Sequence, residues 1–347
     1  MTRRFFYAKS TDRQIDISFC LPVYNVREYV GDCINSILKQ DIEDINIEIL
    51  CIDDFSTDGT YEELIRLSKK HKLIRIIRNN KNIGVSATRN RLISESKGKY
   101  IWFVDPDDLL YPGAVSLLFN AANYHQSEVT LANYLKFTKL EQIKVEHTEW
   151  NAHIVENDYL PFDEESGRKM CAVWAGIFLR KFLIENELRF QEQMIAQEDT
   201  LFYYEFGLRV NKVVKCDFPC YLYRIRSTSI MHSRSEERAK KYYKSMLVMY
   251  QVYKKHLISG DYNDELVLKN KIHHTQQNIA FCLAMLQDYS FVYKEIKRLK
   301  KKGLYPYRLR YDALHTKEPI IRRLCNFLLP FEPVFWLLHY IYSYVNR

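Results

Sequence analysis

The sequence predicts an α/β fold in which a mostly parallel sheet is followed by a helical C-terminal extension. Short apolar runs alternate with amphipathic segments from residue 16 onward, a pattern typical of βαβ units. Polar and acidic residues follow each apolar run, at the carboxyl ends of parallel strands, where such sheets bind ligands. After residue 223 the pattern changes to long helices.

The first third of the chain supplies the alternation. The run Ile17–Leu21 is expected to be a strand that stops at Pro22. The segment Glu28–Leu38 places apolar residues three and four positions apart, which is the stripe of an amphipathic helix. The two patterns then repeat, and they predict strands at 47–52, 73–77 and 100–104 and helices at 60–71 and 84–96.

The later elements are less regular. Residues 128–219 mix short strands with expected helices at 181–186 and 198–208, and long helices are expected at 236–257 and 266–301. The chain is therefore expected to comprise an N-terminal arm (1–15), a catalytic sheet domain (16–219), a helical extension (220–318) and an amphipathic aromatic tail (319–347).

Composition and missing motifs exclude several classes of protein. With 47% hydrophobic and 27% charged residues, the chain is neither disordered nor collagenous. The formal charge of +8 suits phosphates, anionic lipid or nucleic acid without choosing among them. The eight cysteines are scattered and no signal peptide precedes them, so a reducing cytoplasm is expected. The sequence has neither a dinucleotide-binding glycine fingerprint nor a P-loop, which excludes dehydrogenases and P-loop kinases.

Three aspartates, Asp105, Asp107 and Asp108, directly follow the expected strand at 100–104. Carboxylates at this spacing can hold a hard divalent cation and leave its other positions for water and a diphosphate. Such a cation would neutralise the charge that builds on a departing phosphate. The alternative is a solvated turn in which Asp107 or Asp108 caps the next helix.

Polar side chains also lie at or near the expected ends of three other strands or helices. Asp53 and Asp54 end the second strand, where an ionised carboxylate can accept the imide N–H of a uracil-like base. Arg89, one turn into a helix, suits a phosphate or a base edge, unless it is an ordinary surface arginine. Glu198 and Asp199 open a later helix, where one can act as a general base or both serve only as caps and salt bridges.

Together these segments resemble, in order and spacing, the family 2 glycosyltransferases with the GT-A fold. The resemblance covers residues 16 to 231, and its first four motifs are jointly specific. The chain departs from the family's usual residues at Phe55 and Arg91, where glycine is common. The segments are Pro22-Val-Tyr-Asn25, Asp53-Asp-Phe-Ser-Thr-Asp58, Asn82-Ile-Gly-Val-Ser-Ala-Thr-Arg-Asn90, Phe103-Val-Asp-Pro-Asp-Asp108 and Glu198-Asp199.

The resemblance also implies a role for individual residues. Asp199 matches the family's general base, and Asp105 and Asp107 match the D-x-D pair that holds ribose and a divalent metal, Mn²⁺ or Mg²⁺. Positions around the nucleotide-sugar donor match Pro22, Tyr24, Asn25, Glu28, Asp53, Asp54 and Arg89. Candidates for the acceptor side or the diphosphate are Trp174, Glu198, Arg224 and Arg226.

The activity that the resemblance implies is inverting transfer of a sugar from a nucleotide diphosphate, expected to be UDP, to an acceptor hydroxyl. The acceptor is expected to be a saccharide or a lipid-linked chain in surface polysaccharide or glycolipid assembly, with no nucleic acid partner. Two alternatives stay open. One is a sugar-phosphate nucleotidyltransferase, which would need a glycine-rich phosphate loop after the first strand; the other is a non-catalytic carbohydrate-binding protein.

The tail at 319–347 is the most apolar segment of the chain. Its uninterrupted part, 334–345, would form a helix of about 18 Å, shorter than the roughly 30 Å of bilayer hydrocarbon. The basic residues before it, with Trp336 and several tyrosines, are typical of an interfacial anchor. Ordinary packing on the core is the alternative. We expect peripheral association with the cytoplasmic face of the cell membrane.

Overall fold

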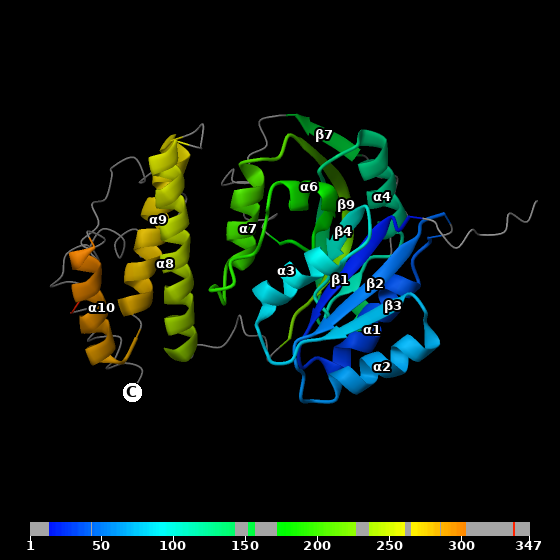
Figure 1. Ribbon diagram of the computed structural model, residues 1–347, viewed down its shortest axis with the longest axis horizontal. Helices are drawn as coiled ribbons and strands as arrows, with labels where there is room; N and C mark the ends of the chain where they lie inside the picture. The colour runs from blue at the N-terminus through cyan, green and yellow to red at the C-terminus, as the bar shows by residue number, and fades with distance from the viewer. Residues whose placement is uncertain are drawn as a thin grey trace, which may run out of the picture. The chain divides into compact units, whose positions relative to one another are not determined.

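The computed structural model describes residues 14–42, 44–142, 152–156, 172–226, 236–260, 265–284 and 286–302, together with Trp336 (Figure 1). The chain divides into two compact units. The sheet unit takes in Met1–Glu192 and Asp199–Ser227, and the helical unit takes in Gln193–Glu198 and Thr228–Arg347. The expected boundary at residue 219 falls inside a strand of the sheet unit, β9, which runs from Lys212 to Arg224.

Four parallel strands form one half of the sheet, in the order β3-β2-β1-β4. Every residue of β1 and β2 is buried, as expected for parallel strands that are covered on both faces. Because the strands are parallel, their carboxyl ends meet at one edge of the sheet. The strands are β1 (Ile17–Val23), β2 (Ile47–Asp53), β3 (Ile74–Arg78) and β4 (Tyr100–Phe103).

The first strand differs from its prediction, because it continues through Pro22 to Val23. Pro22 lies opposite Ile52 in the register with β2. On the other side, the pairing with β4 ends at Cys20 and Phe103, so Pro22 lies where β1 has a neighbouring strand on one side only. Proline is tolerated at such a position because no second strand requires its missing N–H.

Helices cover both faces of this half of the sheet (Figure 1). Val30 of α1 and Leu64 of α2 pack into the core cluster on one face, while Leu92 of α3 packs into the cluster on the other. The predicted alternation of strands and helices is therefore confirmed. The helices are α1 (Arg27–Leu38), α2 (Thr60–Lys70) and α3 (Val85–Glu95).

Beyond β4 the sheet is mixed. The strand β8 is antiparallel to both β4 and β6, and β9 is parallel to β6 but antiparallel to β5 and β7. In the part of the chain that the structure describes, nine strands form one sheet. The remaining elements of this unit are β5 (Leu109–Leu110), α4 (Ala114–His125), β6 (Val129–Phe137), a short 3-10 helix (Leu140–Gln142), β7 (Ala152–Glu156), β8 (Gly176–Leu179), α6 (Arg180–Glu185) and α7 (Glu198–Gly207).

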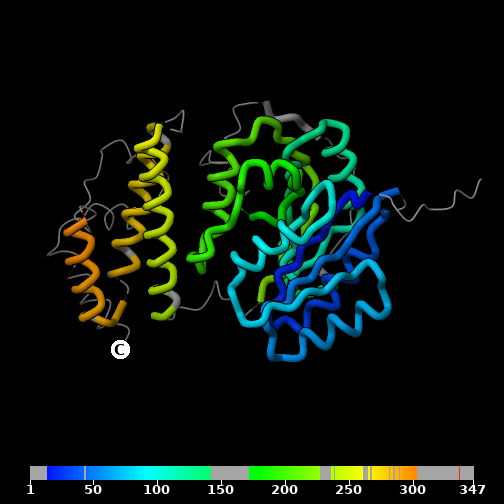
Figure 2. Tube along the Cα trace, in the orientation of Figure 1, coloured from blue at the N-terminus to red at the C-terminus, as the bar shows by residue number. Residues whose placement is uncertain are grey.

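The helical unit contains α8 (Glu236–Ser259), α9 (Glu265–Ala284) and α10 (Tyr289–Lys301). Figure 2 shows the trace running along α8, back along α9 and forward again along α10. The prediction of one helix over 266–301 is wrong, because the segment is divided between α9 and α10. The helix α9 ends at Ala284, and Asp288 caps the start of α10 by accepting the N–H of Phe291 at 3.0 Å. Aspartate is favoured at this N-cap position, so a new helix begins there.

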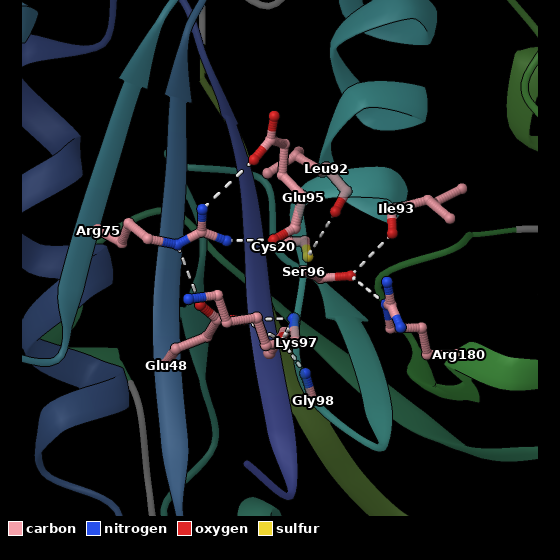
Figure 3. Close-up of polar contacts among 11 residues, drawn as sticks. Cys20, Glu48, Arg75, Leu92, Ile93, Glu95, Ser96, Lys97, Gly98 and Arg180 are labelled. Atoms are coloured by element: carbon pink, nitrogen blue, oxygen red, sulfur yellow. Dashed lines mark hydrogen bonds and ion pairs between the residues drawn. The ribbon is translucent and has the colours of Figure 1, made fainter. Parts of the chain in front are cut away.

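A buried polar cluster fixes the far end of α3, at the amino-terminal edge of the sheet (Figure 3). Glu48 of β2 accepts hydrogen bonds from Ser18 Oγ at 2.6 Å, from the N–H of Lys97 at 2.7 Å and from Arg75 Nε at 3.2 Å. Arg75 also donates to the carbonyl of Glu95, the last residue of α3. The C-terminal end of α3 is therefore tied to β1, β2 and β3, while its N-terminal end lies at the opposite edge of the sheet, beside Asp54 at the end of β2.

Two predictions fall on residues outside the described ranges. The N-terminal arm is described only at residues 14 and 15, and the aromatic tail only at Trp336. The ring centroid of Trp336 lies 6.4 Å from that of Tyr293 in α10. No helix among the described residues combines the length and apolarity needed to cross a bilayer. Attachment of the tail to a membrane surface remains a prediction.

Candidate active site

The carboxyl ends of the four parallel strands bring the predicted segments together. Val23 of β1 lies opposite Asp53 of β2, and Asp53 lies opposite Arg78 of β3. The strand β4 ends at Phe103 in register with β1, so Asp105 follows at the same edge. Segments that are separated in the sequence therefore meet at one edge of the sheet.

Asp54 is a structural residue at this edge. Its Oδ1 accepts hydrogen bonds from Asn79 Nδ2 at 2.7 Å and from the N–H of Ile83 at 2.8 Å, and its Oδ2 accepts the N–H of Gly84 at 2.8 Å. Only 3% of the residue is exposed. Both carboxylate oxygens therefore bind the loop that leads into α3, and Asp54 fixes the position of that helix rather than presenting an acceptor to a ligand.

Asp53 has a different set of partners. Its Oδ2 lies 3.0 Å from Arg78 Nε, and the N–H of Ser56 donates to both of its oxygens at 3.3 Å. The Arg78 guanidinium also lies over two aromatic rings: its Cζ is 4.2 Å from the ring centroid of Tyr61 and 5.3 Å from that of Phe55. Asp53 and Arg78 therefore form a charged pair with an aromatic border, next to the loop that follows β2.

Two aromatic side chains are open at this edge. Tyr24 directly follows β1 and is 46% exposed, and Phe55 lies two residues after the end of β2 and is 44% exposed. Phe55 has a φ of 65°, in the left-handed region, which strains a bulky residue by about 1–3 kcal/mol. Asn25 holds the two loops together, because its Oδ1 accepts the N–H of Thr57 at 2.9 Å. Exposed rings of this kind can stack on a planar base.

The three aspartates after β4 bring their carboxyl groups close together. Burial and the neighbouring carboxylate of Asp105 raise the pKa of Asp107. Burial and the charges of Asp107 and Asp105 raise the pKa of Asp108 to about 9. Neither residue caps the following helix, because α4 begins only at Ala114, after Gly113. The capping alternative is therefore wrong for this structure.

Arg89 links this acidic group to the later part of the chain. Its Nη2 lies 3.0 Å from Asp105 Oδ1, and its Nη1 lies 2.7 Å from Asp199 Oδ1 at the start of α7. The guanidinium also lies 5.3 Å from the ring centroid of Phe190. Arg89 is only 3% exposed, so the surface-arginine alternative is wrong. A buried cation between two carboxylates fixes their relative positions.

Two arginines from the end of β9 contact the same acidic group. Arg226 Nη2 lies 2.5 Å from Asp107 Oδ2. The backbone N–H of Arg224 donates to Asp108 Oδ1 at 2.7 Å, and its Nε donates to the carbonyl of Asp107 at 2.8 Å. Both guanidinium groups lie over the ring of Tyr29, with the ring centroid 5.2 Å from Arg224 Cζ and 5.0 Å from Arg226 Cζ. Positive charge therefore lies beside the D-x-D carboxylates, as phosphate binding requires.

The remaining predicted residues have more peripheral positions. Pro22 is buried inside β1, and Glu28 is exposed in the first turn of α1. Trp174 is buried, with the ring of Tyr221 stacked on it at a centroid distance of 4.3 Å. Glu198 is the first residue of α7. The indole of Trp174 therefore contributes to a packed aromatic cluster in this structure.

The donor set at Asp105 and Asp107 fits a hard divalent cation. Mg²⁺ and related cations prefer oxygen ligands and commonly use one or two carboxylates together with substrate phosphates. Asp105 and Asp107 are close enough to repel each other, and a cation bound between them would offset that repulsion. Among the described residues, no three His, Cys, Asp or Glu side chains are grouped to hold a metal ion on their own. Substrate oxygens would have to complete the coordination.

Several residues of the site carried no assigned role in the sequence analysis. Tyr29 and Asp32 of α1 contact the arginines of β9, Asp32 at 3.6 Å from Arg224 Nη2. Phe190 packs beside Arg89. No local motif marks these residues, because each contacts a partner that is distant in the sequence. Arg78 could have been found, because it directly follows the strand predicted at 73–77, where such a sheet binds ligands.

The amino-acid sequence matches one protein family, described as glycosyl transferase family 2, over residues 18–186. Poly(ribitol-phosphate) beta-glucosyltransferase of Bacillus spizizenii is 30% identical over 207 residues, which cover 59% of this chain and 32% of the relative. The match therefore spans about a third of the length of that curated relative.

Two solved structures share the fold. Staphylococcus aureus TarS 1–349 in complex with UDP-GlcNAc has a TM-score of 0.55 at 18% identity and covers 88% of this chain and 98% of its own. The mannosyltransferase PcManGT from Pyrobaculum calidifontis, in complex with GDP-Man and Mn²⁺, has a TM-score of 0.52 at 13% identity and covers 99% of this chain and 91% of its own. At these identities the likeness concerns the fold, and it confirms the expected α/β architecture of GT-A type.

Proposed function

This chain belongs to glycosyl transferase family 2 through residues 18–186, and from that premise we propose that it transfers a sugar from a UDP-sugar to an acceptor hydroxyl, with inversion at the anomeric carbon. The acceptor that we propose is a saccharide or polyol-phosphate chain in surface polymer or glycolipid assembly. The poly(ribitol-phosphate) in the name of the Bacillus spizizenii relative supports such an acceptor, and the UDP-GlcNAc of the TarS complex supports the donor.

The observation that carries the proposal is the buried bridge from Asp105 through Arg89 to Asp199. It joins a carboxylate of the D-x-D segment to the proposed general base, although the two are far apart in the sequence. The distance from Arg89 is 3.0 Å to Asp105 and 2.7 Å to Asp199. A displacement reaction needs a donor phosphate site and a base at such close range.

In the proposed reaction, Asp199 takes the proton of the acceptor hydroxyl. The acceptor oxygen forms a bond to the anomeric carbon while the bond from that carbon to the diphosphate oxygen breaks, so that UDP leaves with the electron pair. A single in-line displacement of this kind inverts the anomeric centre. Arg89 Nη1 lies 2.7 Å from Asp199 Oδ1 and so fixes the position of this carboxylate.

The remaining groups would bind the donor. The open rings of Tyr24 and Phe55 would stack near the base. Asp53 is fully buried and pairs with Arg78, so it would accept the imide N–H of the base only after the Arg78 side chain moves away. Arg226 and Arg224 would contact the diphosphate. Asp105 and Asp107 would hold a divalent cation, Mn²⁺ or Mg²⁺, which would supply charge neutralisation for the leaving diphosphate.

The proposal is tested with a panel of nucleotide sugars, by measuring nucleotide diphosphate release with Mn²⁺ or Mg²⁺ in the presence and absence of polyol-phosphate acceptor. We expect release from one UDP-sugar. Pyrophosphate formation from a sugar phosphate and UTP would instead support a nucleotidyltransferase. A protein that binds saccharide without turning over any donor would support the carbohydrate-binding alternative.

The assignment of the base is tested with Asp199→Asn. We expect the transfer rate to fall by about 10²–10⁴-fold, as for loss of a general base, while donor affinity stays within a few-fold of the wild type. The matched control is Glu205→Gln, an acid on the same helix that pairs with Arg209 at 3.0 Å. Full activity of the Asp199 variant, or an equal loss in the control, would contradict the assignment.

A further inference from the structure

We propose that the groove between α8 and α10 of the helical unit binds one anionic membrane lipid, with its phosphate on a basic rim and its acyl chain on an apolar floor. The groove has a volume of about 590 Å³, and the described residues that line it come from these two helices and their C-terminal ends. The proposal does not depend on sugar transfer, because each of these described residues lies in the helical unit.

The floor of the groove is apolar. The side chains of Tyr250 and Leu299 are buried beneath it, and Leu247 lies beside them. Ile258, in the last turn of α8, is 82% exposed at the groove. One exposed isoleucine is ordinary on a protein surface, but here it lines the same groove as Leu247, Tyr250 and Leu299. An acyl chain laid along it would remove this apolar surface from water.

The rim is positively charged. Lys254, Lys255, Arg298 and Lys302 line the groove, whereas no Asp or Glu is among its described lining residues. Arg298 is partly neutralised by Glu295 of its own helix, at 3.0 Å. None of the ion pairs found among the described residues involves the three lysines. Lysine and arginine are favoured at helix C-termini even where no ligand binds. That preference does not explain why the cations here border an apolar groove.

The apolar floor and the basic rim together indicate which molecule the groove would bind. Free phosphate would match the rim and leave the apolar floor exposed to water, whereas a neutral lipid would match the floor and leave the rim unpaired. The apolar segment 327–346 of this chain carries one acidic residue, Glu332, and no Lys or Arg, so it would leave most of the four cationic side chains of the rim without a matching charge. An anionic phospholipid supplies both a phosphate and an apolar chain, and basic side chains near an anionic headgroup each contribute favourably.

The experiment is co-sedimentation of the full chain, without donor, with phosphatidylcholine vesicles that contain or lack phosphatidylglycerol. We expect binding only to the anionic vesicles. Lys254→Gln combined with Lys255→Gln should weaken it by roughly 30-fold, since each basic residue contributes about a fivefold factor. The charge-matched control is Lys294→Gln with Lys297→Gln, two exposed lysines of α10 outside the groove. Equal loss in both pairs would show diffuse surface attraction and overturn the proposal.

A second pair of measurements separates a lipid site from a phosphate site. Ile258→Ser keeps every charge and changes a side chain that is already exposed, so it should fold normally, and we expect it to weaken vesicle binding several-fold. Dihexanoyl phosphatidylglycerol should compete with the vesicles, whereas inorganic phosphate at equal concentration should not. Wild-type binding by the Ile258 variant, or equal competition by phosphate, would refute the lipid assignment. Thermal unfolding by circular dichroism checks that each variant is folded.

Discussion

Asp54→Asn should destabilise the sheet unit severely, although it changes neither the size nor the shape of the side chain. The carboxylate accepts three hydrogen bonds, from Asn79 Nδ2, the N–H of Ile83 and the N–H of Gly84, at 2.7, 2.8 and 2.8 Å. The asparagine amide nitrogen can only donate. Its best orientation keeps Oδ1 toward Asn79 and Ile83, and therefore leaves the Gly84 N–H facing another donor.

The magnitude follows from these contacts. An unsatisfied buried donor costs about 1–3 kcal/mol, and two charge-assisted bonds that become neutral lose about 0.5–1 kcal/mol each. Loss of a negative charge at the start of α3 costs a further ~0.3–1 kcal/mol. We therefore expect the free energy of unfolding to fall by about 3–5 kcal/mol, a large part of the 5–15 kcal/mol that is typical of a domain.

The assay is urea unfolding followed by tryptophan fluorescence, because Trp102 and Trp174 are both buried in the sheet unit. The control is Asp44→Asn, the same chemical change in an exposed loop residue, which should stay within about 0.5 kcal/mol of the wild type. A change of less than about 1 kcal/mol for Asp54→Asn would refute the structural role, and would return Asp54 to the candidates for base recognition.

Three further predictions concern other parts of the sheet unit. Arg89→Lys should lower the transfer rate by about 10- to 100-fold, because one ammonium cannot reproduce the fork that holds Asp199; rates within twofold of the wild type would contradict this. Gly98→Ala should destabilise by about 1–3 kcal/mol, because its Cβ would lie 2.5 Å from a backbone nitrogen. Gly31→Ala, where the new Cβ meets its nearest neighbour at 3.7 Å, should stabilise α1 by about 0.5–1 kcal/mol, and urea midpoints that shift in the same direction for both glycines would refute this explanation. Burial raises the pKa of Asp58, but hydrogen bonds from the Thr60 hydroxyl and from neighbouring backbone N–H groups lower it by more, so the folded pKa lies below the ordinary value. The ionised carboxylate therefore adds stability at pH values above the unfolded pKa, and this stability is lost as the pH falls through the folded pKa. In Asp58→Asn the melting temperature should depend less on pH below about pH 4 than in the wild type, and an unchanged pH dependence would contradict this.

The repeated pattern of apolar runs determined the sheet half of the fold. Alternation with a period near 2 or 3.6 is a local property, so strands and amphipathic helices can be read from neighbouring residues. Parallel pairing then places all strand ends at one edge, so the sequence alone predicts that Asp53 and Asp105 lie at the same edge of the sheet. The same local rules failed at Pro22 and in the segment 266–301. There, the number of neighbouring strands and the cap at Asp288 decided the outcome.

The tertiary structure alone determined the different hydrogen-bond partners of Asp53 and Asp54. Asp53 and Asp54 are adjacent and chemically identical, yet Asp54 is saturated by the loop before α3 while Asp53 pairs with Arg78. Likewise, nothing in the sequence places Asp199 at 2.7 Å from Arg89. Hydrogen bonds and ion pairs are directional and act over about 3 Å, so their partners depend on how distant segments pack, whereas hydrophobic periodicity depends only on the residues of one segment.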